Sequence, residues 1–576
     1  MRSSLRFLLA VSAFSLVASC GDSQTTGEET PAAPASTDTE TTTDDATAPG
    51  AEAGDISSQD LARHIATLAS DAFEGRAPGT PGGEKTRAYI ASEYERIGLE
   101  PIGDSFEQPV PIVESTLQPD SSSFSVSING EARDLEYRTD VVYWTKRAEE
   151  NVEFADSELV FVGYGVVAPE YDWNDYDGVD VEGKTVVILV NDPGFATQDP
   201  DLFNGNAMTY YGRWTYKYEE AARQGAAAAM IIHDTAPAAY GWNVVEGSWS
   251  GPQVDLQRDD NGASRVAAEG WFSNDIARTL FDATGLDMDA QMQAAMSRDF
   301  QAVPMPGVTA SAVLNNKIVR SEDANVVGVL KGAQRPDEYV LYMGHWDHLG
   351  TNPDTEGDDK IYNGAVDNAT GIAAIIEIAE KFATNETAPD RSIMLVAVTA
   401  EESGLLGSAY FGEYPPVPLK QIVAGVNIDA ILPTPPSKDM IVVGYGASEL
   451  EDILKDVAGG YNRYLTPDPE AEKGYFYRSD HISLAKKGVP MLYADGGADL
   501  VDGGTDAGEA YGADYRENRY HAPSDEYDAD WPMDGMLDTV EILYEVGATI
   551  AYSDDWPNWY EGNEFRALRD AQLAGE

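Results

Sequence analysis

A series of short, almost wholly apolar runs in the second half of the chain constrains its fold more than any other feature. The run 393–398 reads Ile-Met-Leu-Val-Ala-Val and predicts a strand at 393–399. Further runs predict strands at 325–330, 339–343, 423–428, 440–443 and 490–493. Helical spacing of apolar residues predicts helices at 371–383, 448–458 and 533–552. Since strands that are apolar on both faces are typical of buried sheets, we expect an α/β fold with a mixed, mainly parallel sheet covered by helices on both faces.

Five clusters of histidine and carboxylate residues lie where these strands end or helices begin. They are Gly344-His345-Trp346-Asp347-His348, Gly364–Gly371 around Asp367, Ala400-Glu401-Glu402-Ser403-Gly404, Asn427-Ile428-Asp429 and Tyr520–Asp525 with His521. Adjacent carboxylates such as Glu401 and Glu402 repel each other unless a cation or a proton relieves them. Each cluster alone has an ordinary explanation, such as a helix cap or a surface pair. Five in one segment favour a metal site, and oxygen donors mixed with imidazoles favour zinc over manganese or cobalt.

The order GHxD, GAxDNxTG, EExG, NxD and YHxxxD resembles that of the M28 family of two-zinc exopeptidases. The likeness covers about 56–150 and 320–553 and includes the segment Gly75–Thr80. It implies one zinc bound by His345, Asp367 and Asp429, and a second bound by Asp367, Glu402 and His521, so that Asp367 bridges them. It also implies that Glu401 is the general base toward a water whose pKa the metals lower. Asp347 is expected to orient His345 or the metal environment from behind.

The other histidines have weaker assignments. Arg478-Ser479-Asp480-His481 resembles the family segment SDH. His481 is expected either to hold the carbonyl oxygen of the substrate or to be a structural residue bonded to Asp480. His348 departs from the commoner family pattern GHxDS, and a supporting or surface role is expected in preference to substrate contact. His64 and His233 have no ligand partner at motif spacing and are expected to be structural.

The stretch from about 156 to 305 has a different character. Leu159–Gly165 and Gly183–Val190 predict strands, and Gly225–Ile232 predicts another after a helix at 216–224. The pattern resembles the protease-associated domain, a small β-rich insert. Upstream, helices are predicted near 56–73 and at 84–97, and antiparallel strands between 108 and 142. The expected organisation is a peptidase domain in two parts, 56–155 and 306–553, with an insert at 156–305 and a charged tail at 554–576.

The first twenty residues have the features of a targeting segment. Met1–Arg6 is basic, and the apolar run Phe7–Val17 is too short to span a bilayer as a mature helix. It ends in Val17-Ala18-Ser19-Cys20, which resembles the lipobox of bacterial lipoproteins, with an ordinary signal peptide as the alternative. Residues 21–55 have almost no large apolar residue and predict a disordered linker. We therefore expect a signal peptide at 1–20, lipidation at Cys20, and attachment outside the cytoplasm at the outer membrane or in the periplasm.

The composition excludes several classes of partner and site. The formal net charge is −61, and nucleic acid is therefore not an expected partner, because phosphate binding needs a basic face. The single cysteine excludes an internal disulfide and a zinc ribbon. The acidic loop 498–514 lies between His481 and His521. It is open to three interpretations, namely a calcium site, a surface that selects basic substrates, or a solvated loop, which is the default.

The expected function is that of a zinc-dependent exopeptidase, most simply an aminopeptidase that hydrolyses N-terminal peptide bonds of peptides or proteins. Three alternatives stay open. A glutaminyl cyclase of the same fold typically binds one zinc, and a non-catalytic, receptor-like member would lack metal ligands, none of which is missing here. A carboxypeptidase would require a cationic pocket for the substrate carboxylate, for which Arg478 is the only candidate near the motifs.

Overall fold

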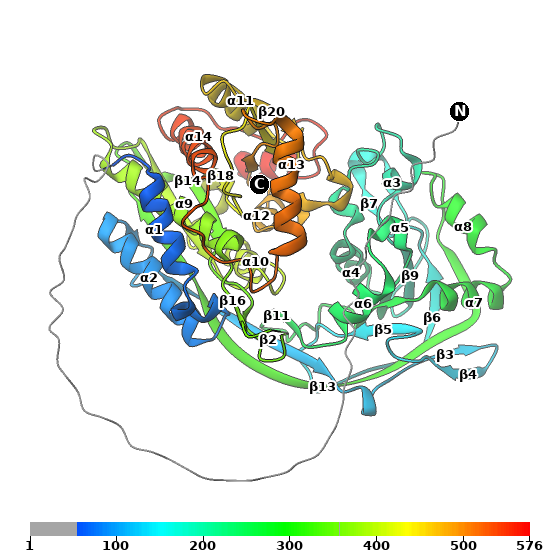
Figure 1. Ribbon diagram of the computed structural model, residues 1–576. Helices are drawn as coiled ribbons and strands as arrows, with labels where there is room; N and C mark the ends of the chain where they lie inside the picture. The colour runs from blue at the N-terminus through cyan, green and yellow to red at the C-terminus, as the bar shows by residue number, and fades with distance from the viewer. Residues whose placement is uncertain (1–53, 356, 576) are drawn as a thin grey trace, which may run out of the picture. The chain divides into compact units, whose positions relative to one another are not determined.

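The computed structural model describes residues 54–355 and 357–575. The expected signal peptide, the lipidation site Cys20 and nearly all of the expected linker lie outside the described residues. Within those ranges, no helix combines the length and apolar character needed to cross a bilayer. The described chain builds two large β-sheets that share one strand (Figure 1), and two small sheets of two strands each.

The first sheet has a parallel centre. Four parallel strands form it, in the order β17 (Arg391–Val398), β14 (Arg335–His345), β18 (Ile422–Asn427) and β21 (Met491–Gly496). Beyond β17 lie β13 (Val303–Leu330), β2 (Glu107–Leu117), β11 (Gln253–Leu256) and the short β1 (Glu100–Pro101), all in antiparallel pairs. Beyond β21 lie the antiparallel β19 (Asp439–Val442) and, parallel to it, β20 (Tyr464–Pro467). The predicted mixed, mainly parallel sheet is confirmed.

Helices cover both faces of this sheet, as predicted. Successive residues of a strand point to opposite faces, so Tyr342 and Leu341 belong to different cores. One face is covered by α1 (Ser58–Leu68), α2 (Pro81–Ile97), α9 (Thr370–Thr384), α11 (Leu450–Gly460) and α14 (Asp534–Ala551). The other face is covered by α10 (Leu406–Glu413), α12 (His481–Ala485) and the residues around α15 (Arg566–Ala574).

Local sequence sets the limits of the first two helices. The hydroxyl of Ser57 accepts a hydrogen bond from the backbone N–H of Asp60 at 3.1 Å and so begins α1. Thr80 caps α2 in the same way, and Pro81 occupies its first turn, where no N–H is needed. Gly98 ends α2 with φ at 91°, in the left-handed region that favours glycine. The predicted helix, break and helix in this part of the chain are confirmed.

The second sheet holds the predicted insert. Its strands run in the order β4 (Glu131–Asp134), β3 (Ser123–Ile128), β13, β6 (Asn151–Phe161), β9 (Thr185–Leu189), β10 (Ala228–Ile232), β12 (Ala268–Phe272) and β5 (Val141–Trp144). One face packs against α4 (Trp214–Arg223) and α6 (Trp242–Trp249), the other against α7 (Asn274–Thr284) and α8 (Met288–Ala294). The strands and the helix predicted between 159 and 232 are confirmed.

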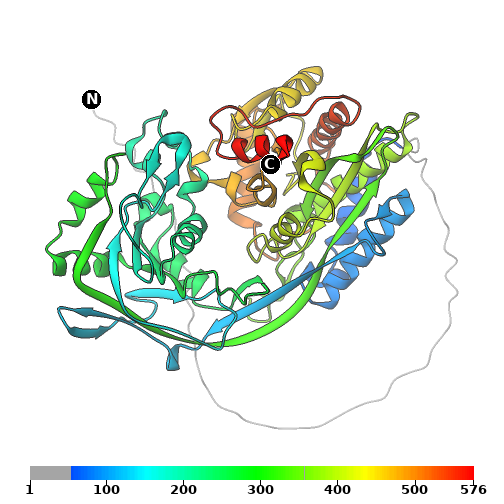
Figure 2. The same cartoon turned by 180° about the vertical axis from the view of Figure 1, so that it is seen from behind.

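The second sheet extends further along the chain than the predicted insert. The predicted boundary at 155/156 falls inside β6, and the strands over 123–144 belong to the second sheet. The reason is β13, a single strand of 28 residues that pairs with β3 and β6 in its first half and with β2 and β17 in its second. Figure 2 shows this strand from behind. Because β13 is a single unbroken strand, no loop or linker in the sequence marks the junction between the two sheets.

Two segments are more ordered than the sequence indicates. The acidic loop expected at 498–514 contains most of a helix, α13 (Gly504–Asn518), whose glycines hide its helical period. The expected charged tail packs on the first sheet. In it, buried Trp559 donates to Gly488 O at 3.0 Å, and buried Arg569 donates to Ile422 O at 2.8 Å. The only residue that α15 buries is charged, Arg569, so no apolar stripe in the sequence predicts this helix.

Candidate metal centre

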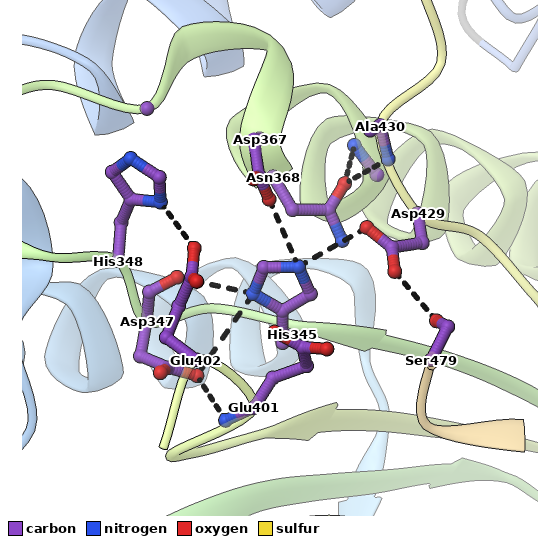
Figure 3. Close-up of polar contacts among 12 residues, drawn as sticks. His345, Asp347, His348, Asp367, Asn368, Glu401, Glu402, Asp429, Ala430 and Ser479 are labelled. Carbon is purple, nitrogen blue, oxygen red and sulfur yellow. Dashed lines mark hydrogen bonds and ion pairs between the residues drawn. The ribbon is translucent and has the colours of Figure 1, made fainter. Parts of the chain in front are cut away.

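Three parallel strands end at the candidate metal centre. His345 is the last residue of β14, and Glu401 and Glu402 follow β17. Asp429 follows β18 after one intervening residue. Because the carboxyl ends of parallel strands meet at one edge of the sheet, these side chains come together (Figure 3).

Asp367 lies between two histidines. It belongs to a turn, Ala365–Ala369, that leads into α9. Its Oδ1 is 3.2 Å from His345 Nε2, and its Oδ2 is 3.3 Å from Nε2 of His521, which comes from the connection between α13 and α14. Asp429 Oδ1 completes the first group at 3.1 Å from His345 Nε2, and Glu402 Oε2 completes the second at 3.1 Å from His521 Nε2. The structure therefore brings all five predicted ligands together, in two groups that share Asp367.

The donor set fits divalent metal ions. Potential ligand atoms of His345, Asp367 and Asp429 lie within 4.8 Å of one another. Among the ion pairs of the described residues, no lysine or arginine pairs with these carboxylates. Burial raises the pKa of Asp367, but hydrogen bonds from His345 and His521 outweigh it and hold that pKa well below its usual range. Buried carboxylates that face imidazoles, with no basic side chain paired to them, are the surroundings that a bound cation stabilises.

The two adjacent glutamates have different surroundings. Burial and the charge of Asp367 raise the pKa of Glu402, but hydrogen bonds from His348 and His521 lower it to about 2. Burial raises the pKa of Glu401 well above its usual range, and the negative charges of Glu402 and Asp429 add to this effect. Glu402 is thus held ionised, as a metal ligand requires, whereas Glu401 is suited to accept and hold a proton.

Asp347 supports two of the predicted residues at once. It is fully buried, and its Oδ1 accepts a hydrogen bond from the backbone N–H of Glu401 at 3.0 Å. His345 Nδ1 is 3.1 Å from the backbone oxygen of Asp347 and 3.9 Å from its Oδ1. Burial raises the pKa of Asp347 to about 8. This residue therefore fixes the strand end of Glu401 as well as the ring of His345.

The turn that carries Asp367 is held from two sides. The carboxylate of Asp525 accepts hydrogen bonds from the backbone N–H groups of Val366 and Asp367, each at 3.1 Å. Asn368 Oδ1 accepts one from Ala430 N at 2.9 Å and so ties the turn to the end of β18. The sequence contained Asp525 in a recognised motif but gave it no role, because its contacts are to backbone groups.

Arg76 is a second supporting residue that sequence reasoning left without a role. Its buried guanidinium donates to the backbone oxygens of Leu68, Trp346 and Gly364 at 2.8 to 3.0 Å. It also donates to Asn363 O at 2.5 Å. Its position in the recognised segment Gly75–Thr80 was the only signal. Arg76 joins the end of α1 to the end of β14 and to the turn before α9.

His481 does not show the predicted bond to Asp480. Among the described residues, neither of its ring nitrogens has a hydrogen-bond partner. Burial lowers the pKa of His481 to about 3, and the neutral ring packs against Phe476 and Tyr493 at centroid distances of 4.6 and 5.2 Å. The proposed contact with the substrate oxygen stays a prediction.

Of the three remaining histidines, His348 lies at the candidate metal centre, and His64 and His233 lie elsewhere. His348 is buried, not at the surface, and its Nδ1 is 2.6 Å from Glu402 Oε1. His64 Nδ1 is 2.7 Å from the hydroxyl of Tyr89, and His233 Nε2 is 3.1 Å from Tyr240 O. His64 and His233 are buried structural residues, as predicted.

Arg478, the candidate that the sequence offered for a cationic pocket, lines a small pocket together with Arg213, which was not foreseen. The pocket has a volume of about 80 Å³, and its polar lining comes from the insert, with Arg213 and Tyr240, and from the first-sheet region, with Lys473 and Arg478. Burial and the nearby charge of Arg478 lower the pKa of Arg213 to about 10. Arg213 lies 265 positions before Arg478 in the chain, so no motif spacing could connect them.

Comparison with known proteins places the metal centre in a recognised segment. Residues 325–543 match the model of Peptidase family M28. Over 107 residues the chain is 37% identical to a probable zinc metalloprotease of Pyrenophora teres f. teres (strain 0-1). This alignment covers 18% of this chain and 22% of that protein. Over 168 residues it is 29% identical to aminopeptidase NAALADL1 of Mus musculus. This second alignment covers 27% of this chain and 21% of that protein. The chain thus spans about a fifth of the length of these curated relatives.

Among solved structures, an aminopeptidase from Aneurinibacillus sp. strain AM-1 aligns with 86% of this chain and 93% of its own, at 16% identity and a TM-score of 0.43. The segment matched by the family model contains His345, Asp367, Glu402, Asp429 and His521 together. The segment that builds the candidate metal centre is therefore similar to peptidase family M28.

Proposed function

We propose that this protein is a zinc-dependent exopeptidase of the two-metal type, acting as an aminopeptidase on the N-terminal bond of peptides. One observation carries the proposal. The two oxygens of Asp367 are divided between two donor groups, at 3.2 Å from His345 and 3.3 Å from His521. A carboxylate shared in this way suits two neighbouring metal ions. The match of residues 325–543 to Peptidase family M28 supports the reaction class.

The residues of the centre have separate roles in this proposal. His345, Asp367 and Asp429 would hold one zinc, and Asp367, Glu402 and His521 the other. Zinc, when bound, supplies Lewis acidity and lowers the pKa of water from 15.7 toward about 7. Glu401, with its raised pKa, takes the proton of the attacking water on its carboxylate and passes it to the nitrogen of the leaving amine. Asp347 holds Glu401 in place through its backbone N–H.

Metal analysis and substrate assays test this proposal together. We expect two zinc ions per chain, and we expect chelation to abolish hydrolysis of aminoacyl-anilides until zinc is restored. Full activity in metal-free protein would end the proposal. A single zinc with cyclisation of N-terminal glutamine would favour the glutaminyl cyclase alternative instead.

A carboxypeptidase is a second candidate, and the cationic pocket favours it. Among the described residues, the guanidinium groups of Arg213 and Arg478 form no ion pair, although the chain is strongly acidic. The residue next to Arg478, Ser479, donates its hydroxyl to Asp429 Oδ2 at 2.5 Å. Two unpaired guanidinium groups suit a carboxylate. The pocket therefore offers a place for a free C-terminus, and its Arg478 directly precedes a residue that contacts a proposed metal ligand.

Blocked peptides distinguish the two candidates. A carboxypeptidase cleaves N-acylated dipeptides that have a free C-terminus and spares their C-terminal amides, whereas an aminopeptidase cleaves neither. If the pocket binds the carboxylate, Arg213→Gln should raise KM for the free acids by at least about tenfold, in line with the loss of one charge-assisted hydrogen bond. Cleavage of aminoacyl-anilides alone would reject the carboxypeptidase.

We further propose that the enzyme is held at the cell envelope by lipid on Cys20, and that the insert, of the protease-associated type, contributes to substrate preference. The lipobox-like segment Val17–Cys20 and the strand pattern of the insert support these two points. Cys20→Ser should move the protein from the membrane fraction to the soluble fraction without changing its zinc content. An unchanged distribution would reject the lipid anchor.

A further inference from the structure

We infer that His348 is a ligand of the second metal position, so that this position takes two imidazoles, from His348 and His521, together with the carboxylates of Glu402 and Asp367. The inference rests on the proposed two-metal function and deepens it. His348 is a departure from the family pattern quoted above, and the resemblance gives it no role.

The position of the ring is the first support. His348 Nδ1 is 2.6 Å from Glu402 Oε1, while the other oxygen of Glu402 is 3.1 Å from His521 Nε2. Potential ligand atoms of His348, Asp367 and Glu402 all lie within 4.8 Å of one another. The rings of His348 and His521 have their centroids 5.8 Å apart. Figure 3 shows the nitrogen of His348 turned toward Glu402. Each oxygen of Glu402 thus faces a different imidazole.

The ring is also held rigidly. The side chain of His348 is fully buried, whereas that of His521 is 36% exposed. Gly364 has φ at 55°, and a Cβ placed on it would lie 2.6 Å from two carbons of the His348 ring. The backbone of the turn that carries Asp367 therefore packs directly against His348. One turn fixes both the shared carboxylate and the imidazole.

The polar contacts of the ring point only toward the centre. Among the described residues, His348 Nε2 is buried and has no hydrogen-bond partner. Within the part of the chain that the structure describes, the one hydrogen-bond partner of the ring is therefore Glu402, through Nδ1. An imidazole that only oriented Glu402 would use Nδ1 as a donor, whereas a ligand uses the lone pair of Nδ1. An experiment must separate these two uses of the same atom.

The inference makes the two metal positions unequal. The first position has three protein ligands and keeps a place open, as catalytic zinc sites do. The second position has four protein ligands, the number typical of closed zinc sites. We therefore expect zinc to fill the second position first and to leave it last, so that titration with a chelator should remove the two ions in separate steps.

Cobalt substitution tests the assignment directly. In proton NMR of the dicobalt protein, each bound imidazole gives one paramagnetically shifted N–H signal that exchanges with water. We expect three such signals, from His345, His348 and His521. Two signals from a protein that binds two cobalt ions would overturn the inference and leave the proposed function standing. Binding of only one metal ion would overturn both.

His348→Asn separates a ligand from an orienting donor. The amide nitrogen of asparagine can replace Nδ1 as a donor to Glu402 but does not replace an imidazole as a ligand. If His348 is a ligand, this variant should lose one shifted signal and bind one zinc more weakly by over about 100-fold, beyond the usual effect of an orienting residue. Zinc affinity equal to that of the wild type would overturn the inference. His233→Asn, in the insert, is the matched control and should keep both zinc ions and all three signals.

Discussion

At the scale of single residues, Glu401 and Glu402 are adjacent in sequence yet have opposite surroundings. Glu401→Gln keeps the shape of the side chain and removes the group whose pKa is raised. We expect both zinc ions to stay bound while turnover falls by roughly 10²–10⁴-fold, the usual size of a general acid–base contribution. Inductively coupled plasma analysis of zinc and turnover of an aminoacyl-anilide measure the two quantities on one preparation.

Glu402→Gln is the matched comparison, because it changes the neighbouring residue in the same way. The ionised carboxylate of Glu402 faces two imidazoles. Its loss should weaken one zinc, and added zinc should restore part of the activity. Equal zinc content in the two variants, or loss of zinc from Glu401→Gln alone, would show that the assignment of base and ligand is wrong.

A metal site could be predicted because His345, Asp367 and Asp429 lie near strand ends or a helix start, whereas their roles as ligands came from the resemblance to the M28 family. Residues that act through backbone groups or through distant partners could not be predicted in the same way. Arg76 binds only carbonyl oxygens, which any residue could offer. His348 and Arg213 depend on neighbours that only the folded chain supplies.

At the scale of elements, Arg76 connects three of them through backbone carbonyls. Arg76→Lys keeps the charge but has one nitrogen in place of three, so it can satisfy only part of this set. We expect the free energy of unfolding to fall by about 2–4 kcal/mol, since each charged hydrogen bond contributes about 1.5–3 kcal/mol. Urea denaturation followed by circular dichroism measures the change.

The control for Arg76 is Arg278, whose side chain is 48% exposed and pairs with exposed Asp289. Arg278→Lys should change the free energy of unfolding by less than about 0.5 kcal/mol. If Arg76→Lys had an effect as small as this, the hydrogen bonds by which Arg76 joins α1, β14 and the turn before α9 would not contribute to stability.

Elements with a clear apolar period were predicted close to their observed limits. The strand predicted at 393–399 is β17 (Arg391–Val398), and the helix predicted at 533–552 is α14 (Asp534–Ala551). The helix α13 was missed because Gly504, Gly508 and Gly512 and many acidic residues weaken its pattern.

At the scale of the whole molecule, the shared strand β13 should make the two sheets unfold together. Six of the ten tryptophans lie in the region of the second sheet, at 144, 173, 214, 242, 249 and 271. Tryptophan fluorescence therefore reports mainly on that sheet, and release of zinc to a colorimetric chelator reports on the first. We expect the two signals to change at the same urea concentration. A separate, earlier fluorescence transition would show that the insert unfolds independently.

The division of the chain into an insert and a peptidase domain could be predicted only in outline for the same reason. Residues 123–144 belong with the second sheet through pairings to β13 and β12 that lie more than 100 positions away in sequence. Short alternating strands of this kind fit either sheet by pattern. Their partner is decided by the full length of β13.

The length of β13 also limits how this protein can change during evolution. In its first half, residues 308–316 alternate between buried and less buried positions, while residues 323–329 are buried throughout. Deleting one residue between these halves would turn every side chain of one half to the opposite face of its sheet. Deleting two would keep the faces but shift the pairing. Descendants of this chain should therefore vary in length in the loops around both sheets, while the number of residues in β13 is inherited unchanged.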